Sequence, residues 1–329
     1  MSAGASRQDR VFCCGIDSRY LTRALVMWES LRAFVPGAAL HVVCFDDEAL
    51  ALLRRLDEPG IVPWSLAELE AWDPELAAVK PIRSRVEYMW TTTPCQALFA
   101  LERGGAGTAT YLDADLMFFS SPEPIYEEMG DAPLLLTPAR HPPEHSSREA
   151  YGRFNVQFLP VSDDPRSREG FEWWRERCIE HCSTRLDEQG RYGDQKYLES
   201  WPELFEGVHV LEHPGGGLAP WNMEAHRIES TRNGNNTAVT VDGLPLIFFH
   251  YSLFRRSRRR VQLADARFRL GSEARRGIFK PYAERIDRAG ERIAGLDPAF
   301  DPFDPEPTPM ARFNQTWSAV AGRLSRLRR

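Results

Sequence analysis

Short, unbroken apolar runs alternate with segments of helical periodicity near the start of the chain. Residues 11–16 and 40–45 carry almost only apolar side chains, the pattern of strands that are buried on both faces of a parallel sheet. Residues 20–34 and 48–56 instead carry apolar side chains at helical spacing. Strand, helix, strand, helix at this spacing predicts βαβ units, in which ligands bind at the carboxyl ends of the strands.

The same α/β pattern continues to about residue 254. Further expected elements are a helix over residues 84–103, strands over 108–112, 116–119, 133–137 and 153–161, a helix over 169–182, and a hairpin with strands at 237–241 and 244–249. Asp242-Gly243 lies between the two hairpin strands, and Asp-Gly is a strong turn signal. The expected fold class is therefore α/β, with a mixed, mostly parallel sheet flanked by helices.

The C-terminal part differs in charge from the rest of the chain. Residues 251–329 hold 18 Lys and Arg against 9 Asp and Glu, although the whole chain has a net charge of −6. We therefore divide the chain into an α/β domain, residues 1–254, and a basic, mainly helical extension, residues 255–329. Residues 313–327 form a basic amphipathic pattern, which either lies on an anionic membrane surface or packs on the α/β domain or on a second subunit in a homodimer.

Composition argues against several classes of protein. No run approaches the roughly 20 apolar residues that span a bilayer, and residues 1–10 lack the apolar core of a signal peptide. A cytoplasmic protein is expected, with peripheral contact to the inner membrane face if the basic tail binds lipid. Neither G-x-G-x-x-G nor a Walker sequence is present, which argues against dinucleotide-binding proteins and P-loop NTPases. The basic tail lacks an aromatic platform, which argues against nucleic-acid binding.

Two aspartates follow an expected strand near the middle of the chain. Residues 108–112 lead into Asp113-Ala114-Asp115, and a second apolar run comes directly after them. Two carboxylates at i and i+2 are costly to bury unless a cation lies between them. Their oxygen atoms suit Mg²⁺ or Mn²⁺. The alternative is a turn in which an aspartate caps the next helix.

Two other polar segments lie where a nucleotide could bind. Ile16 ends the first expected strand and Asp17 and Tyr20 follow it, at the edge of the sheet where βαβ folds bind their ligands. Arg83 and Arg85 directly precede or begin the helix expected over residues 84–103, where they could hold a diphosphate. The alternative for the two arginines is a solvated basic turn.

Residues 111–130, YLDADLMFFSSPEPIYEEMG, resemble the Asp-x-Asp segment of metal-dependent, nucleotide-sugar-using glycosyltransferases of the GT-A fold. The segment is most similar to the glycogenin and lipopolysaccharide-galactosyltransferase-like family, and the resemblance covers about residues 10–255. It implies a Rossmann-like GT-A fold and transfer of a sugar from a nucleoside-diphosphate-sugar, a UDP-sugar by preference. It also favours Arg83 and Arg85 as donor contacts, because a basic residue shortly before the Asp-x-Asp strand contacts the nucleotide-sugar in that family.

The resemblance implies roles for further residues in the same order along the chain. Asn155 matches an asparagine that contacts the donor sugar, although Gln157 stands where a small residue is usual. Asp194-Gln195 matches an Asp-Gln pair at the reacting sugar, and the alternative for Asp194 is a helix N-cap. The sequence Ala-Pro-Trp-Asn at 219–222 resembles a Lys-Pro-Trp region that closes GT-A sites, although it lacks the lysine. The resemblance implies that Trp221 and Asn222 also contact the donor.

A late strand of the expected fold ends in His250. In the family that the chain resembles, a strand-end histidine in this place is the third protein ligand of the metal. The resemblance therefore implies Asp113, Asp115 and His250 as the ligands of Mn²⁺ or Mg²⁺, and an imidazole ligand suits Mn²⁺ somewhat better. The alternative is a buried core histidine without a ligand role.

The function implied by the resemblance is sugar transfer to a glycan or lipid-linked acceptor hydroxyl, in the synthesis of a cell-surface glycan or lipopolysaccharide. The order of the motifs leans towards retention of anomeric configuration, and a carboxylate base for inversion stays open. One alternative is a sugar nucleotidyltransferase of similar fold, although the first strand lacks the Gly-rich, basic loop of those enzymes. Another is a catalytically silent binding or scaffold protein, against which the intact acidic residues argue.

Overall fold

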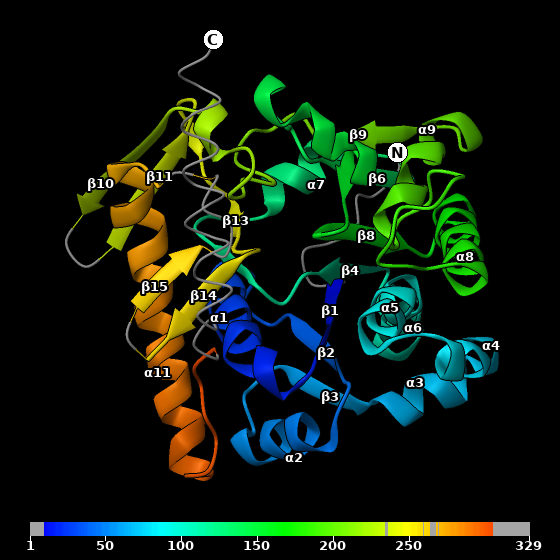
Figure 1. Ribbon diagram of the computed structural model, residues 1–329, viewed down its shortest axis with the longest axis horizontal. Coiled ribbons are helices and arrows are strands. Elements are labelled where there is room, and N and C mark those ends of the chain that lie inside the picture. The colour runs from blue at the N-terminus through cyan, green and yellow to red at the C-terminus, as the bar shows by residue number, and fades with distance from the viewer. Residues whose placement is uncertain (1–9, 234–235, 259, 264–267, 269, 305–329) are drawn as a thin grey trace.

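A five-stranded sheet forms the centre of the molecule (Figure 1). The computed structural model describes residues 10–233, 236–258, 260–263, 268 and 270–304. The sheet has the order β3 (Ile61–Ser65), β2 (Ala39–Cys44), β1 (Arg10–Ile16), β4 (Thr108–Leu112) and β8 (Phe158–Ser162). Its strands pair in parallel except for β8, which is antiparallel to β4 at the edge. The mostly parallel α/β fold expected from the sequence is confirmed.

Helices cover both faces of this sheet (Figure 1). One face carries α1 (Leu21–Arg32), α2 (Asp47–Leu56) and α11 (Lys280–Leu296), and the other carries α6 (Thr93–Gly104) and α8 (Pro165–Glu180). Along β1, Phe12 and Ile16 pack into the core with α1, whereas Val11 and Cys13 pack into the core with α6. Burial on both faces explains why β1 is a continuous apolar run.

Smaller sheets and helices surround this centre. The additional strand pairings are β6 (Leu134–Pro138) with β7 (Phe154–Asn155) and β9 (Val208–Val210), β10 (Ile228–Asn233) with β11 (Asn236–Val241) and β12 (Leu244–Pro245), β5 (Leu116–Phe118) with β13 (Phe248–His250), and β14 (Phe254–Ser257) with β15 (Arg260–Leu263). The shorter helices are α3 (Leu66–Trp72), α4 (Pro74–Val79), α5 (Arg85–Thr91), α7 (Glu123–Met129), α9 (Trp201–Leu204) and α10 (Ser272–Ala274). Helical turns of 3-10 or π type span Ser18–Tyr20, Lys80–Ile82, Pro143–Tyr151, Gln195–Ser200, Met223–Ala225 and Arg275–Phe279.

Two expected elements are each divided in the structure. The single helix expected over residues 84–103 is wrong, because α5 ends at Thr91 and α6 begins at Thr93. Pro94 lies in the first turn of α6, where a backbone N–H would have no helical partner in any case. The same proline cannot continue α5, because it has no N–H to donate. The strand expected over 153–161 is likewise split into β7 and β8.

The C-terminal third departs from the expected hairpin and extension in two ways. The Asp242-Gly243 turn is confirmed, since both residues have positive φ. After β12, however, the chain leaves the hairpin and forms β13, which pairs with β5. The extension also begins with the β14–β15 hairpin before it becomes helical. The division of the chain at residue 254 stays a prediction.

α11 packs into the same hydrophobic core as α1, through residues that include Tyr282, Ile286 and Ile293. The basic amphipathic pattern over 313–327 lies outside the described residues. No helix within the described part of the chain is long and apolar enough to cross a membrane.

Candidate active site

An antiparallel strand pair joins the Asp-x-Asp segment to His250. Asp115 directly precedes β5, and β5 pairs with β13 in a register that sets His250 opposite Leu116. The backbone N–H of Tyr251 also donates to the carbonyl oxygen of Asp115 at 2.9 Å. Main-chain hydrogen bonds therefore hold Asp115 and His250 beside each other, although they lie 135 positions apart in the chain.

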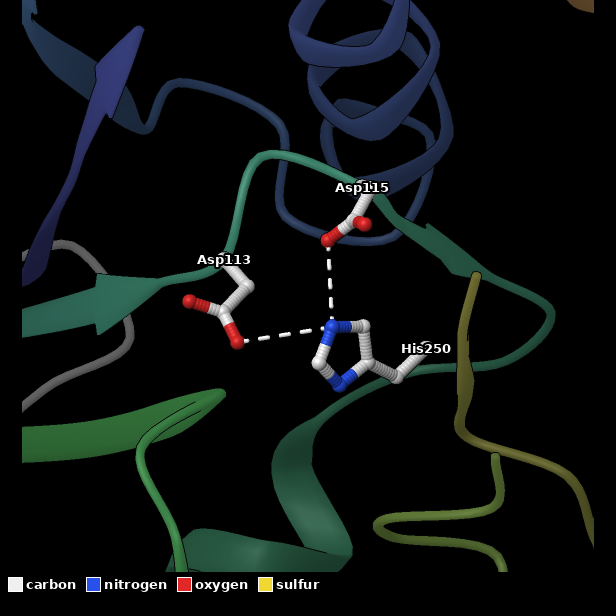
Figure 2. Close-up of side chains that lie close together, drawn as sticks. All are labelled: Asp113, Asp115 and His250. Carbon is white, nitrogen blue, oxygen red and sulfur yellow. Dashed lines mark ion pairs between the residues drawn. The ribbon is translucent and has the colours of Figure 1, made fainter. Parts of the chain in front are cut away.

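The side chains of Asp113, Asp115 and His250 converge (Figure 2). His250 Nε2 lies 3.1 Å from Asp115 Oδ1 and 3.5 Å from Asp113 Oδ2. One ligand atom from each of the three side chains lies within 4.8 Å of the others. Two carboxylates and an imidazole are donors that bind Mn²⁺ or Mg²⁺. The three residues fit a divalent cation in chemistry and in spacing.

Burial makes the charges of this cluster depend on one another. Burial, with help from Asp115, raises the pKa of Asp113 to about 6, against the opposing effect of His250. Burial also disfavours ionised Asp115, but the neighbouring His250 outweighs it and holds the pKa of Asp115 below its usual value. Conversely, burial would lower the pKa of His250, but Asp115 raises it above its usual value. The imidazole and the Asp115 carboxylate thus favour each other's charged forms, and a divalent cation held by the three side chains would favour the ionised carboxylates in the same way.

The three residues lie in the wall of a cavity of about 900 Å³. Most of the residues expected at the site line the same cavity: Asp17, Tyr20, Arg85, Asp113, Asp115, Asn155, Asp194, Gln195, Trp221 and His250. These residues come from segments spread over more than 230 positions of the chain. The fold therefore gathers the separate sequence motifs around one concave site.

Asp194 lies buried in this cavity and is not a helix cap. It precedes the helical turn Gln195–Ser200, but its side chain makes no capping hydrogen bond there. Oδ2 of Asp194 has no hydrogen-bond partner within the described part of the chain. Burial raises the pKa of Asp194 to about 7, with a smaller contribution from Asp113. A buried carboxyl group with one unpartnered oxygen and a pKa raised to about 7 is typical of a functional site.

Sequence comparison relates the chain to two Bacillus subtilis proteins, although no family model matches it. It is 33% identical over 296 residues to YfnD of strain 168, a match that covers 88% of this chain and 93% of YfnD. It is 31% identical over 314 residues to YfnF of the same strain, over 89% of this chain and 96% of YfnF. The chain belongs to the YfnD and YfnF family. Both relatives are named as uncharacterized proteins.

Solved structures similar in fold to this YfnD-family chain are named as glycosyltransferases. The galactosyltransferase LgtC, in complex with donor and acceptor sugar analogs, aligns with a TM-score of 0.49 and 17% identity over 85% of this chain and 95% of LgtC. Mouse xyloside xylosyltransferase 1 aligns with a TM-score of 0.43 and 14% identity over 64% of this chain and 87% of its own. At these sequence identities the similarity concerns the fold alone.

Asp17 and Arg85 of the YfnD-family chain interact at the edge of the cavity. Arg85 Nη2 donates to Asp17 Oδ2 and to Asp46 Oδ2, each at 3.2 Å, and the Arg85 side chain remains 56% exposed. Asp17 Oδ1 accepts from the backbone N–H of Arg19 and so begins the helical turn before α1. Tyr20 follows with 40% of its surface exposed, and the nearby Asp115 raises its pKa to about 12. These side chains leave a charged and aromatic rim that a ligand can reach.

Three residues expected at the site do not line the cavity. Ile16 is fully buried in the core with α1. Arg83 turns away, and its Nη2 donates to the carbonyl oxygen of Ile179 at 2.9 Å. Asn222 is buried and binds backbone, because Nδ2 donates to the carbonyl oxygens of Ala139 and Gly217. The geometry gives these three residues structural contacts instead of a place in the cavity wall.

Trp221, Asn155 and Gln195 line the cavity but are themselves tied to the protein. The ring of Trp221 stands nearly perpendicular to that of His250 with centroids 5.4 Å apart, and its Nε1 donates to the carbonyl oxygen of Ala139. Asn155 Oδ1 accepts from the backbone N–H of Gln157. Gln195 Nε2 donates to the carbonyl oxygen of Tyr151 at 2.7 Å. The roles expected for these residues toward a donor stay predictions.

The glycines at 215–217 are explained by packing. A Cβ on Gly215 would lie 2.0 Å from the carbonyl oxygen of Pro245, and one on Gly216 would lie 2.6 Å from the Leu211 side chain. Gly217 has a φ of +96°, a conformation that side chains with a Cβ rarely adopt. None of the three lines the cavity in the described part of the chain.

Several further residues line the cavity although they were not expected at the site from the sequence. They are Arg23, Trp90, Thr93, Gln96, Tyr111, Tyr151, Tyr192, Arg255 and Asp304. Tyr111 donates its hydroxyl to Asp113 Oδ1 at 3.2 Å, and Arg23 Nη2 contacts both oxygens of Asp304 at 2.9 Å. Tyr111 begins the Asp-x-Asp segment, and Arg255 belongs to the basic C-terminal part of the chain. The others have no pattern of their own and are brought to the cavity by tertiary folding.

Proposed function

We propose that this protein is a metal-dependent glycosyltransferase, which moves a sugar from a nucleoside-diphosphate-sugar, a UDP-sugar by preference, to an acceptor hydroxyl. The observation that carries the proposal is the Asp113, Asp115 and His250 cluster in the wall of a cavity that also holds Asp194. A cluster with the chemistry of a metal site, beside a buried carboxyl group with a perturbed pKa, is a reasonable site for transfer chemistry.

The metal would be bound by Asp113, Asp115 and His250. When bound, a divalent cation acts as a Lewis acid and neutralises the negative charge that develops on the departing diphosphate. Mn²⁺ is preferred over Mg²⁺ in this proposal because one ligand is an imidazole. Tyr111 and Trp221 hold the cluster in place, the first through its hydroxyl on Asp113 and the second by packing against the His250 ring.

The nucleotide would lie along Asp17, Tyr20 and Arg85. Tyr20 offers an exposed ring against which a base can stack, and Arg85 offers guanidinium N–H groups for a phosphate. Arg85 is held by the two carboxylates of Asp17 and Asp46, so its orientation is set before a ligand arrives. Preorganised donors of this kind cost little entropy on binding.

Asp194 would lie beside the anomeric carbon of the transferred sugar. In the retaining course that we favour, the bond between that carbon and the diphosphate oxygen breaks, and its electron pair stays on the oxygen. The acceptor oxygen forms the new bond on the same face, and its proton passes to the departing phosphate oxygen. The ionised Asp194 carboxylate would then stabilise the positive charge that develops on the sugar. The acceptor would be a glycan or a lipid-linked saccharide of a cell-surface or lipopolysaccharide pathway.

Thermal melting with a panel of nucleotide-sugars tests the proposal. A UDP-sugar at about 100 times its Kd should stabilise the native protein by about 2.7 kcal/mol. For a chain of 329 residues that corresponds to a rise in Tm of roughly 3–5 °C, seen with Mn²⁺ and absent with EDTA. Product analysis should then find UDP, the product of sugar transfer. A sugar nucleotidyltransferase would instead release pyrophosphate from a nucleoside triphosphate. A panel in which no nucleotide-sugar raises Tm would reject the proposal.

Arg85→Gln is expected to weaken UDP binding in Mn²⁺ about five- to tenfold, measured by calorimetry. The loss corresponds to one charge-assisted hydrogen bond of about 1–1.5 kcal/mol at a partly exposed position. Arg83→Gln is the matched control, because Arg83 lies only two positions earlier but donates to a backbone carbonyl outside the cavity wall. Equal weakening by both substitutions would show that the nucleotide does not lie along Arg85.

A further inference from the structure

Gln96 is a buried cavity residue with an unused hydrogen-bond acceptor. It lies in the first turns of α6, lines the cavity, and is only 2% exposed. Its Oε1 has no hydrogen-bond partner among the residues that the structure describes. A buried amide oxygen without a partner is costly, because it has lost its hydrogen bonds to water, and such atoms are rare in folded proteins. An unpartnered acceptor in a cavity wall therefore points to a donor on a ligand.

The hydrogen bonds of Thr92 fix which amide atom of Gln96 is free. The Thr92 hydroxyl donates its only hydrogen to the carbonyl oxygen of Met89, at 2.6 Å. Toward Gln96 it can only accept, and it does so from Nε2 at 2.7 Å. The NH₂ group of Gln96 therefore faces Thr92, and the carbonyl oxygen is the atom left for another partner.

Gly15 provides the space that this amide occupies. A Cβ at position 15 would lie 2.7 Å from Nε2 and 2.8 Å from Oε1 of Gln96, and 2.6 Å from the ring of Phe45. Glycine weakens a strand interior, and in strands it often marks a close approach of another group. Here it stands in β1 and lets the Gln96 amide lie against the carboxyl-terminal end of the central strand.

The position of Gln96 lies between the two ends of the proposed donor site. Gly15 and Asp17 are at the end of β1, where the nucleotide is proposed to bind. On the other side, Thr93 begins α6 one turn before Gln96, lines the same cavity, and lies close enough to the Asp194 carboxyl group to lower its pKa. A ligand atom near Gln96 would thus belong to the part of the donor between the base and the anomeric carbon, or to the transferred sugar itself.

We infer that Gln96 reads a hydroxyl group of the transferred sugar through Oε1. The chemistry of the free atom decides this, because an amide oxygen accepts hydrogen bonds and repels the oxygens of a phosphate. The partner must be an O–H or N–H donor, and a sugar hydroxyl beside Asp194 supplies one. This inference rests on the proposed function and makes Gln96 a specificity residue for the donor sugar.

Binding of UDP and of a UDP-sugar to Gln96→Leu separates this role from a structural one. The probes are UDP and whichever of UDP-glucose, UDP-galactose and their N-acetylamino forms binds the unsubstituted protein best, each in Mn²⁺ by calorimetry. We expect Kd for the UDP-sugar to rise at least about tenfold, with Kd for UDP within about twofold, because a site built for a hydroxyl loses binding when that bond cannot form. Gln96→Met, with a side chain of similar length and no amide oxygen, should behave in the same way.

Gln157→Leu is the matched control. Gln157 is also a fully buried glutamine whose amide atoms have no partner in the described part of the chain, but it does not line the cavity. We expect its substitution to leave both Kd values within about twofold. Melting of the metal-free variants establishes that each is folded before binding is compared.

The outcomes separate the inference from the function on which it rests. If the unsubstituted protein binds neither UDP nor any of the UDP-sugars, the proposed function fails and the inference falls with it. If it binds them and both Gln96 variants weaken UDP and UDP-sugar equally, Gln96 contacts the nucleotide and the inference is overturned. Unchanged binding of both ligands by Gln96→Leu and Gln96→Met would overturn it as well. Deoxy forms of the sugar donor identify the hydroxyl. The deoxy donor that lacks it should bind the unsubstituted protein more weakly than the full donor does, whereas Gln96→Leu should bind both donors equally.

Discussion

Asp115→Ala is expected to reduce Mn²⁺-dependent sugar transfer and donor hydrolysis by about 10³-fold or more. The carboxylate is buried, contacts His250 at 3.1 Å, and belongs to the only cluster of metal-binding character found in the described part of the chain. Loss of a ligand removes a Lewis acid that stabilises the transition state by several kcal/mol, and each 1.36 kcal/mol is a factor of ten in rate. The measurement is release of UDP from a UDP-sugar with and without acceptor, over a range of Mn²⁺ concentrations.

A surface aspartate provides the control for this substitution. Asp163 has a side chain that is 70% exposed and pairs with Arg168, and it does not line the cavity, so Asp163→Ala should keep full activity. In thermal melting, Mn²⁺ should raise the Tm of the unsubstituted protein and of Asp163→Ala but leave Asp115→Ala unchanged. Equal turnover by Asp115→Ala and the unsubstituted protein would refute a catalytic metal at this cluster and favour a silent binding protein.

Asp194→Asn is expected to lower kcat by about 10²- to 10⁴-fold while Kd for UDP changes only a few-fold. An asparagine keeps the shape of the side chain but removes the negative charge proposed to face the reacting sugar. Stopped reactions give kcat and calorimetry gives Kd. A variant with a raised Kd and unchanged kcat would instead assign Asp194 to donor binding.

The same substitution should make the metal-free protein more stable at alkaline pH. Burial raises the folded-state pKa of Asp194 to about 7, above its ordinary value of 3.8. The folded state therefore holds this proton more tightly than the unfolded state, and stability falls as the pH rises from about 4 through 7. Between pH 5 and pH 8 the unsubstituted protein should lose about 2–3 kcal/mol through this group, a loss that Asp194→Asn avoids.

Asp73 is a buried aspartate for which we expect the opposite effect. Burial also disfavours its ionised form, but Arg175 binds both of its oxygens, and its pKa lies below the usual value. Its contribution is present above the unfolded-state pKa and is lost as the pH falls through the lower, folded-state pKa. Asp73→Asn should therefore destabilise the protein at pH 7 by about 3 kcal/mol without a selective effect on kcat. Urea unfolding at pH 5 and pH 8 measures the free energy of unfolding of both variants. If Asp194→Asn were destabilised like Asp73→Asn, Asp194 would be a structural residue.

Segments with strong local signals could be predicted from the sequence. β1 and β2 are apolar runs buried on both faces, and the Asp-Gly turn adopts the positive φ angles that such a turn requires. The Asp-x-Asp segment follows β4 as expected, because a strand and the turn after it are specified by neighbouring residues. The residues Asp113, Asp115 and His250 were also grouped from the sequence, though only through a resemblance of motif order.

The directions in which the side chains of Arg83, Arg85 and Asn222 point depend on tertiary contacts. Arg83 and Arg85 are indistinguishable by composition, yet the capping box at Ser84 begins α5 between them. Arg85 consequently faces Asp17, whereas Arg83 reaches the end of α8 at Ile179. Asn222 was expected at the donor for its sequence context, but three buried backbone groups engage its side chain.

The spacing of neighbouring residues is enough to predict the central strands, the helices α1 and α2 and the acidic segment of the site. Two features of the site follow from the folded chain alone. β13 pairs with β5 and so carries His250 to Asp115, and Gln96 keeps an unpartnered oxygen beside Gly15 in the described part of the chain. Both features arise from main-chain and side-chain contacts between segments far apart in the chain, for which no local periodicity gives a signal.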